Sequence, residues 1–212
     1  SDVVPLVGEN RIIAKYGLTV LSKTKNLGLR ALYDAAGIDP TKISSYTVGF
    51  QIGPRINAPG RIDHATKSFA LLTTDDKEEA KKLAVSLNET NEKRQSEMLN
   101  LEKKAESVIE KEGLLKNKAI VIAGDWHKGV LGPSASHLIE KYNRPVIIFS
   151  DRDDPFVGSA RSISGVNIIE ILTRCQDSIA RFGGHKGAAG LAVKKSKFQS
   201  FSRHFLEQCE KL

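Results

Sequence analysis

The sequence predicts an α/β fold in which a helical segment and a long connecting helix precede a C-terminal sheet domain. Apolar residues at helical spacing dominate residues 1–74, and a long charged stretch occupies residues 75–113. From residue 114 to residue 212, short apolar runs alternate with helical segments. This alternation is typical of a mixed, partly parallel sheet. We therefore expect three parts with these boundaries.

The first part should consist of short helices. Ile12 and Val20 fall on one face of the first helix, Gly37 is a typical helix end, and Asp39-Pro40 is a typical helix start. The expected helices cover residues 9–22, 27–36, about 40–50 and 63–72.

Residues 53–61 (GPRINAPGR) should form a rigid loop, because two glycines and two prolines interrupt both helices and central strands. Such a loop would present Arg55, Asn57 and Arg61 outward. Planar guanidinium groups bind phosphate oxygens well. The alternative is an ordinary turn with solvated arginines.

A single long helix should begin at a cap formed by Thr74 or Asp75 and end before Gly113. Both ends of this helix carry an apolar stripe, but residues 88–97 contain no apolar residue. A stretch that is polar all round usually bridges domains, so we expect a spacer. A coiled coil is the alternative, and the missing apolar residues argue against it.

The C-terminal part should alternate strands and helices, with a βαβ unit that favours parallel neighbours. The expected strands are residues 119–123, 145–149, 156–162 and 188–193, and the expected helices are residues 132–142, 166–174 and 198–210.

Two segments of this part combine glycine with polar groups at element ends. Residues 125–132 follow a strand and precede a helix, where ligands bind in open α/β sheets, so His127 is a candidate. The alternative places Trp126 in the core and His127 on the surface. In residues 158–162, strand alternation should place Ser159 and Arg161 on one face, suited to a phosphate, although an ordinary β-edge would look similar.

Residues 182–190 (FGGHKGAAG) form the third candidate. Four glycines should disfavour regular structure and allow a loop whose backbone amides bind an anion. Gly183 and Gly184 would bring the backbone close, while His185 and Lys186 supply donors and charge. A flexible surface loop is the alternative.

The net charge of +7 favours an anionic partner. Residues 76–112 carry ten acidic and eight basic residues, so the rest of the chain carries +9. Aromatic residues make up 6%, which favours contacts to a nucleic-acid backbone over base stacking. With no membrane-length apolar run and only Cys175 and Cys209, we expect a cytoplasmic protein with reduced thiols.

The segments GPRINAPGR, GDWHKGVLG, GSARS and FGGHKGAAG, in this order, resemble the C-terminal half of the RecJ family. These are single-strand-specific 5′ exonucleases of the DHH phosphoesterase superfamily that act in DNA repair and recombination. The resemblance implies a DHHA1-like C-terminal domain, and it covers nearly all of the chain. Shorter relatives that cleave oligonucleotides or cyclic dinucleotides usually lack the first segment.

The resemblance also implies where the chemistry would occur. Asp2 matches a manganese ligand of the family, but the chain has no Asp-His-His triplet, and one carboxylate cannot hold a pair of divalent ions. Mn²⁺ or Mg²⁺ would therefore belong to a catalytic lobe outside this chain. The chain by itself should hold no metal and be inactive. His185 would act at the scissile phosphate as the catalytic residue here. The phosphate-binding residues would be Arg55, Asn57, Arg61, His127, Ser159, Arg161, Gly183, Gly184 and Lys186.

The expected partner is single-stranded nucleic acid, most naturally DNA, with a single-strand-binding protein or a helicase as protein partners and no membrane. Two other functions stay open. One is an oligonucleotide or cyclic dinucleotide phosphodiesterase of the same superfamily, and the other is a non-catalytic nucleic-acid-binding module or interaction scaffold.

Overall fold

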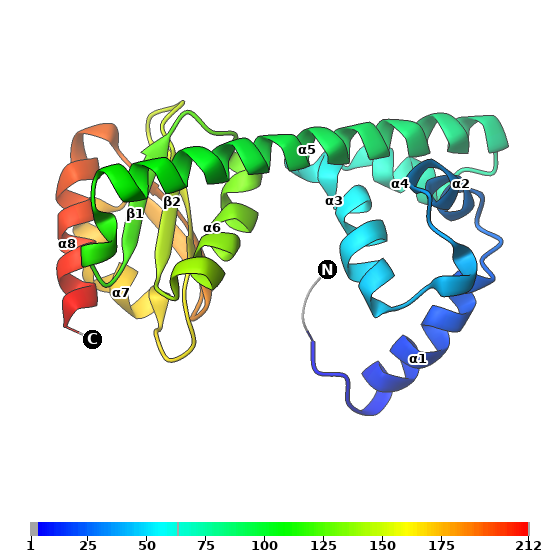
Figure 1. Ribbon diagram of the computed structural model, residues 1–212, viewed down its shortest axis with the longest axis horizontal. Coiled ribbons are helices and arrows are strands. Elements are labelled where there is room, and N and C mark those ends of the chain that lie inside the picture. The colour runs from blue at the N-terminus through cyan, green and yellow to red at the C-terminus, as the bar shows by residue number, and fades with distance from the viewer. Residues whose placement is uncertain (1–3, 63, 212) are drawn as a thin grey trace. The chain divides into compact units, whose positions relative to one another are not determined.

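The computed structural model describes residues 4–62 and 64–211, which form two compact units, 1–95 and 96–212. The helix α5 (Lys77–Lys111) contributes its first half to one unit and its second half to the other (Figure 1). The Asp76 carboxylate begins this helix by accepting from the backbone N–H groups of Glu78 and Glu79 at 2.7 and 2.9 Å. Gly113, in the left-handed region at φ 61°, follows its end as expected.

The first unit is helical. Its elements are α1 (Gly8–Ser22), α2 (Leu27–Ala36), the 3₁₀ turn Pro40–Lys42, the π-helix Thr47–Ile52, α3 (Gly53–Ile62) and α4 (Thr66–Thr73). Leu32, Leu71 and Leu87 form the centre of its core and are fully buried. Gly28 permits this packing, because a Cβ at this position would lie 1.7 Å from the Leu71 carbonyl oxygen. The helices predicted over residues 9–22 and 27–36 are confirmed, and the one predicted over residues 40–50 is replaced by the two shorter elements.

The loop predicted over residues 53–61 is wrong, because these residues form α3. Pro54 directly follows the π-helix, with which α3 is continuous, and the Gly53 N–H before it bonds five residues back to the Val48 carbonyl oxygen. Pro59 lies inside the helix, but Ala58 and Pro59 are both buried, so packing outweighs the poor helix propensity. The Ser68 hydroxyl also donates to the Ile56 carbonyl oxygen at 2.6 Å and fixes α3 against α4.

The second unit is a three-layer α/β domain (Figure 1). Its sheet has the strand order β1-β2-β3-β5-β4. Its strands are β1 (Ile120–Gly124), β2 (Val146–Ser150), β3 (Phe156–Arg161), β4 (Arg181–His185) and β5 (Ala188–Val193). Its helices are α6 (Lys128–Tyr142), α7 (Ile168–Arg174) and α8 (Phe198–Glu210), with 3₁₀ turns at Leu114–Lys116, Gln176–Ser178 and Lys195–Lys197. Strands β1 and β2 are parallel and the other pairs antiparallel, so the predicted mixed sheet is confirmed.

The two faces of the sheet carry separate cores. The second half of α5 and helix α6 cover one face, with Leu101, Leu131 and Ile148 in their core. Helices α7 and α8 cover the other, where Phe149 and Phe201 are fully buried. Because successive side chains of a strand point to opposite faces, both cores are built from alternate residues of the same strands.

Two predicted boundaries in this unit are corrected. Helix α6 begins at Lys128, four residues before the expected start, with Pro133 inside it. Residues 182–190 are not a loop but the hairpin of β4 and β5, joined by Lys186 and Gly187. Of the strand glycines, Gly184 is approached closely by the backbone of Ala188, whereas Gly183 and Gly190 face open space. The described residues include no helix that is both long and apolar enough to cross a bilayer.

Candidate functional site

Strand β3 brings Ser159 and Arg161 onto one face of the sheet, as predicted. Both are half-buried, and the residues between and before them, Gly158 and Ala160, point into the opposite core. The Arg161 Nη1 donates to the Ser159 hydroxyl at 3.0 Å and to the Ala160 carbonyl oxygen at 2.8 Å. The guanidinium is thereby held beside the hydroxyl, and both can face a common ligand.

The strand register extends this face to β4. Ser159 pairs with Gly190, which pairs with Gly183. One row further along, Arg161 pairs with Ala188, which pairs with His185. Directly paired residues of neighbouring strands project to the same face. The structure therefore places Ser159, Arg161, Gly183 and His185 on one surface, which we call the open sheet face.

Helix α6 packs on β2 and β3 and half-buries Ser159 and Arg161, while the face is open over β5 and β4. Gly183 and Gly190 are exposed, and a Cβ built on either would meet no atom within 4 Å. A glycine platform of this kind lets a ligand approach the backbone without obstruction. His185 is also exposed at its edge.

Gly132 of α6 makes room for the Arg161 side chain. A Cβ at position 132 would lie 2.7 Å from Arg161 Nη2 and 3.3 Å from the Ser159 hydroxyl oxygen. The guanidinium therefore lies directly against the helix backbone. The segment around Gly132 was singled out in the sequence, but the role of this glycine depends on a contact that only the fold reveals.

Two His-Lys-Gly tripeptides adopt the same local hydrogen bond. The His127 Nδ1 accepts from the Gly129 N–H at 3.1 Å, and the His185 Nδ1 accepts from the Gly187 N–H at 3.3 Å. With Nδ1 as the acceptor, the proton of each neutral ring resides on Nε2, which is then a donor suited to a phosphate oxygen. The repeated tripeptide was visible in the sequence and could have revealed this.

His127 lies at another border of the same face. It caps the first turn of α6, and together with Ser150 and Val157 it lines a shallow hollow. Val157 is on the same side of β3 as Ser159. Trp126, by contrast, is buried, and its carbonyl oxygen accepts from the Ser150 hydroxyl at 2.6 Å.

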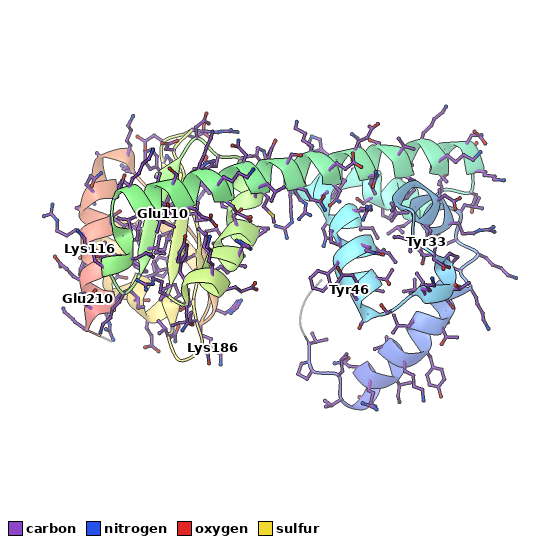
Figure 2. All side chains as sticks on the ribbon, viewed as in Figure 1. Tyr33, Tyr46, Glu110, Lys116, Lys186 and Glu210 are labelled. Carbon is purple, nitrogen blue, oxygen red and sulfur yellow. The ribbon has the colours of Figure 1, made fainter. Side chains whose placement is uncertain are left out.

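Gly184 faces away from the open sheet face, and Lys186 follows His185 at its border. Gly184 pairs with Ala189 and turns to the opposite side, where a Cβ would lie 2.2 Å from the Ala188 carbonyl oxygen. Lys186 lies in the hairpin turn with an exposed side chain (Figure 2). Its carbonyl oxygen accepts from the Ile168 N–H at 3.0 Å.

The three predicted residues of α3 do not converge. The Arg55 Nε donates to Asn88 Oδ1 and its Nη1 to the Gln51 carbonyl oxygen, both at 2.8 Å, so this guanidinium joins α3 to α5. Burial lowers the pKa of Arg55, and the charge of Glu92 opposes that effect. Asn57 and Arg61 are exposed and, four residues apart, share another side of the helix.

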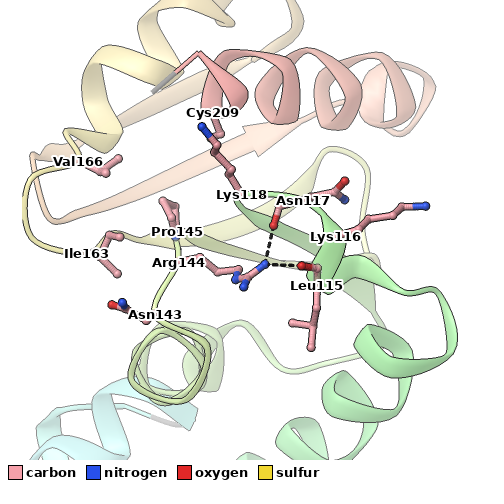
Figure 3. A pocket seen from close by; sticks show the side chains of 10 residues that line it. All are labelled: Leu115, Lys116, Asn117, Lys118, Asn143, Arg144, Pro145, Ile163, Val166 and Cys209. Carbon is pink, nitrogen blue, oxygen red and sulfur yellow. Dashed lines mark hydrogen bonds between the residues drawn. The ribbon is translucent and has the colours of Figure 1, made fainter.

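A further hollow lies at the amino ends of β1 and β2 (Figure 3). Its Arg144 Nη1 donates to the Leu115 and Asn117 carbonyl oxygens at 2.7 and 2.6 Å. This guanidinium therefore holds the segment that precedes β1 against the segment that precedes β2. Over residues 4–62 and 64–211, no group of three or more His, Cys, Asp or Glu side chains could hold a metal ion. Asp2, the predicted manganese ligand, lies outside the described residues.

Comparisons with known proteins bear on the family and the fold. Residues 116–211 match the family described as DHHA1 domain, which defines the class of the second unit. The chain is 39% identical to the single-stranded-DNA-specific exonuclease RecJ of Bacillus subtilis over 92% of its length, and 35% identical to that of Escherichia coli over 98%. It spans 25% and 38% of those relatives.

Solved structures extend the likeness to the fold. The crystal structure of RecJ from Thermus thermophilus in complex with Mg²⁺ matches the whole chain at 33% identity and a TM-score of 0.87, with 33% of that protein covered. A structure of exonuclease RecJ bound to manganese matches at 34% identity and a TM-score of 0.82, with 52% covered. The chain is thus a RecJ-like polypeptide corresponding to the C-terminal part of these proteins, as its motifs indicated.

Proposed function

We propose that this chain supplies the DNA-binding wall of a RecJ-like, single-strand-specific 5′ exonuclease that acts in DNA repair and recombination. The observation that carries the proposal is the open sheet face, where one guanidinium, one hydroxyl, one imidazole and a glycine platform share a surface. Such groups bind phosphate oxygens and allow a sugar–phosphate backbone to approach closely.

Each residue has a distinct role in this proposal. Arg161 and Ser159 bind a terminal phosphate or its neighbour, and His185 Nε2 donates to an oxygen of the scissile phosphate. Gly183 keeps the platform free of side chains, while His127 and Lys186 add donors at its borders. Arg61 and Asn57 of the first unit bind the backbone elsewhere along the strand, and Gly184 shapes the hairpin.

As the resemblance implies, metal chemistry is assigned to a catalytic lobe outside this chain, to which Asp2 would add one ligand. Bound Mn²⁺ or Mg²⁺ would activate a water molecule for attack on the phosphodiester. The residues of this chain would bind and orient the substrate and supply hydrogen-bond donors to its phosphates.

A binding measurement tests the proposal. A labelled single strand of about 12 nucleotides should bind the chain with an affinity that falls as salt rises, since phosphate contacts release counterions. Arg161→Met should weaken binding, more for a 5′-phosphorylated strand than for a 5′-hydroxyl strand. Equal affinity of Arg161→Met and the original chain for both strands would remove Arg161 from the site.

A phosphodiesterase for dinucleotides would use the same phosphate-binding groups. It differs in needing no further contacts along the strand, so its affinity should not increase between a dinucleotide and a 12-mer. A non-catalytic binding module would bind the strand equally well, yet a polypeptide that also contains the metal-binding lobe would not cleave it.

A further inference from the structure

A polar pair continues the buried stripe of α5. Ala80, Ala84 and Leu87 follow each other at helical spacing and are fully or almost fully buried in the core of the first unit. The next two positions of the same stripe are Asn91 and Arg94. Asn91 is only 1% exposed and Arg94 is half-buried, so these polar groups lie where the pattern would place apolar side chains.

Their hydrogen bonds leave donors unused. The Arg94 Nη2 donates to Asn91 Oδ1 at 3.1 Å, which orients the amide. Within the described residues, Asn91 Nδ2 and Arg94 Nε are buried and have no hydrogen-bond partner. Buried polar groups are nearly always paired, so two unpaired donors on neighbouring side chains indicate a missing acceptor.

The electrostatics also indicate an anion. Burial lowers the pKa of Arg94, and the nearby positive charge of Arg61 lowers it further. Arg61 lies in the last turn of α3 and is exposed, and Arg94 is half-buried, so part of this place faces solvent. Two cations close enough to oppose each other's charge are a frequent feature of anion sites.

We propose that Arg94, Asn91 and Arg61 form a binding site for a phosphate group, and, resting on the proposed function, that the group is a phosphodiester of the bound single strand. The free groups of these three side chains are N–H donors and positive charge, because the acceptor Asn91 Oδ1 is already bonded to Arg94 Nη2. The site therefore suits a phosphate oxygen and excludes a metal cation or an apolar ligand. Arg94 and Asn91 are then binding residues in the stretch that the sequence had suggested was a spacer.

Thermal unfolding tests the site without nucleic acid. We compare the 212-residue chain in sodium phosphate and in sodium chloride at equal ionic strength, with Arg94→Met as the variant and Lys93→Met as its charge-matched control on the exposed side of α5. Phosphate should raise the Tm of the original chain and of Lys93→Met, because binding to the folded state stabilises it. Arg94→Met should lose this rise while unfolding in chloride at or above the original Tm.

The result that would overturn the site is a rise that Arg94→Met retains. A large loss of Tm for Arg94→Met in chloride, without any phosphate effect on the original chain, would likewise overturn it and assign Arg94 to structure alone. Arg94→Lys keeps the positive charge but loses the planar guanidinium with its several fixed donors. Its Tm should therefore rise in phosphate by part of the amount seen for the original chain.

Binding of a single strand separates this inference from the proposed function. Arg94→Met should reduce the slope of log affinity against log salt by about 0.7, the value for one phosphate contact to a single strand. Tight strand binding with an unchanged slope would overturn the strand assignment and leave the proposed function intact. A phosphate-dependent Tm rise without any strand binding would support the anion site and contradict the proposed function.

Discussion

The Arg161 guanidinium lies against Gly132 so closely that a methyl group at position 132 would sit 2.7 Å from its Nη2. Because the clashing atom is the far end of the flexible Arg161 side chain, the fold can accommodate the methyl group if that side chain moves. Gly132 thus fixes where the guanidinium lies, and its replacement should alter binding more than stability.

Gly132→Ala tests this relationship. The methyl group should displace Arg161 from Ser159 and lower single-strand affinity, by roughly 1–3 kcal/mol for the loss of a hydrogen bond to a charged group. Stability should change little, since alanine favours helix by about 1 kcal/mol over glycine and offsets the local clash. Fluorescence anisotropy and thermal unfolding measure the two effects. Gly17→Ala in α1 is the control, because a Cβ there meets nothing within 4 Å. Unaltered affinity in Gly132→Ala would contradict the assignment.

The adjacent glycines of β4 should respond in opposite ways. Gly184→Ala should destabilise the chain by about 1–3 kcal/mol, because its Cβ would lie 2.2 Å from the Ala188 carbonyl oxygen, at φ 154°. Gly183→Ala should retain stability, since its Cβ enters open space, but should weaken strand binding by intruding on the platform. Urea unfolding and anisotropy on both variants check this. Equal loss of stability in the two would show that Gly183 is also needed for folding.

His185 should affect chemistry rather than folding. In a polypeptide that includes the metal-binding lobe, His185→Ala should lower kcat by about 10²–10³, the usual loss for one hydrogen-bond donor to developing charge. Its ring is exposed, so unfolding should be nearly unchanged. The matched control is His204→Ala on α8, whose Nε2 lies 3.1 Å from Gln208 Nε2 on the other side of the sheet domain. If both variants cleave at the original rate, His185 has no catalytic role.

Much of the fold followed from periodicity. The strands around Ile122 and Ile148 and the amphipathic helix α8 have strong apolar patterns, and these elements were placed within one or two residues. Glycine and proline misled the prediction at α3 and at the β4–β5 hairpin, where they were taken as breakers. Tertiary packing around Ala58 and Pro59 stabilises α3, and strand pairing with a close backbone approach at Gly184 forms the hairpin. Neither is visible in a local pattern.

The candidate site was predictable by residue type but not by arrangement. Ser159 and Arg161 could be paired from strand alternation alone. Their alignment with Gly183 and His185 depends on the register of three strands, which the sequence does not specify. Asn91 and Arg94 were missed because a search for apolar stripes treats polar positions as solvent-facing, although the spacing from Leu87 was intact.

Arg55 and Arg61, near the two ends of α3, should separate structure from binding. Arg55→Met should cost about 1–3 kcal/mol of unfolding free energy, since it leaves Asn88 Oδ1 and the Gln51 carbonyl oxygen without their partner. Arg61→Met should leave stability unchanged and reduce the salt dependence of strand binding. Urea unfolding and anisotropy distinguish them, and a stable Arg55→Met with weakened binding would return Arg55 to the phosphate-binding set.

Glu102 should make stability depend on pH. This carboxyl of α5 is almost fully buried, and its Oε1 is without a hydrogen-bond partner among the described residues. Burial raises its pKa, while His137, whose Nε2 lies 4.0 Å from Glu102 Oε2, opposes that effect. Because the folded pKa lies above the unfolded one, the group's favourable contribution is complete below the unfolded pKa and is lost as pH rises through the folded pKa.

Glu102→Gln removes the ionisable group and so should stabilise the chain where Glu102 is charged. The gain should be near zero at about pH 4 and of order 1 kcal/mol at about pH 7, the low end of the cost of an unsatisfied buried charge. Urea unfolding at several pH values measures it. Glu106→Gln is the matched control one turn along α5, where the carboxylate is half-buried and lies 2.7 Å from Lys141 Nζ. That variant should gain nothing as pH rises, and a gain equal to that of Glu102→Gln would assign the effect to overall charge instead of burial.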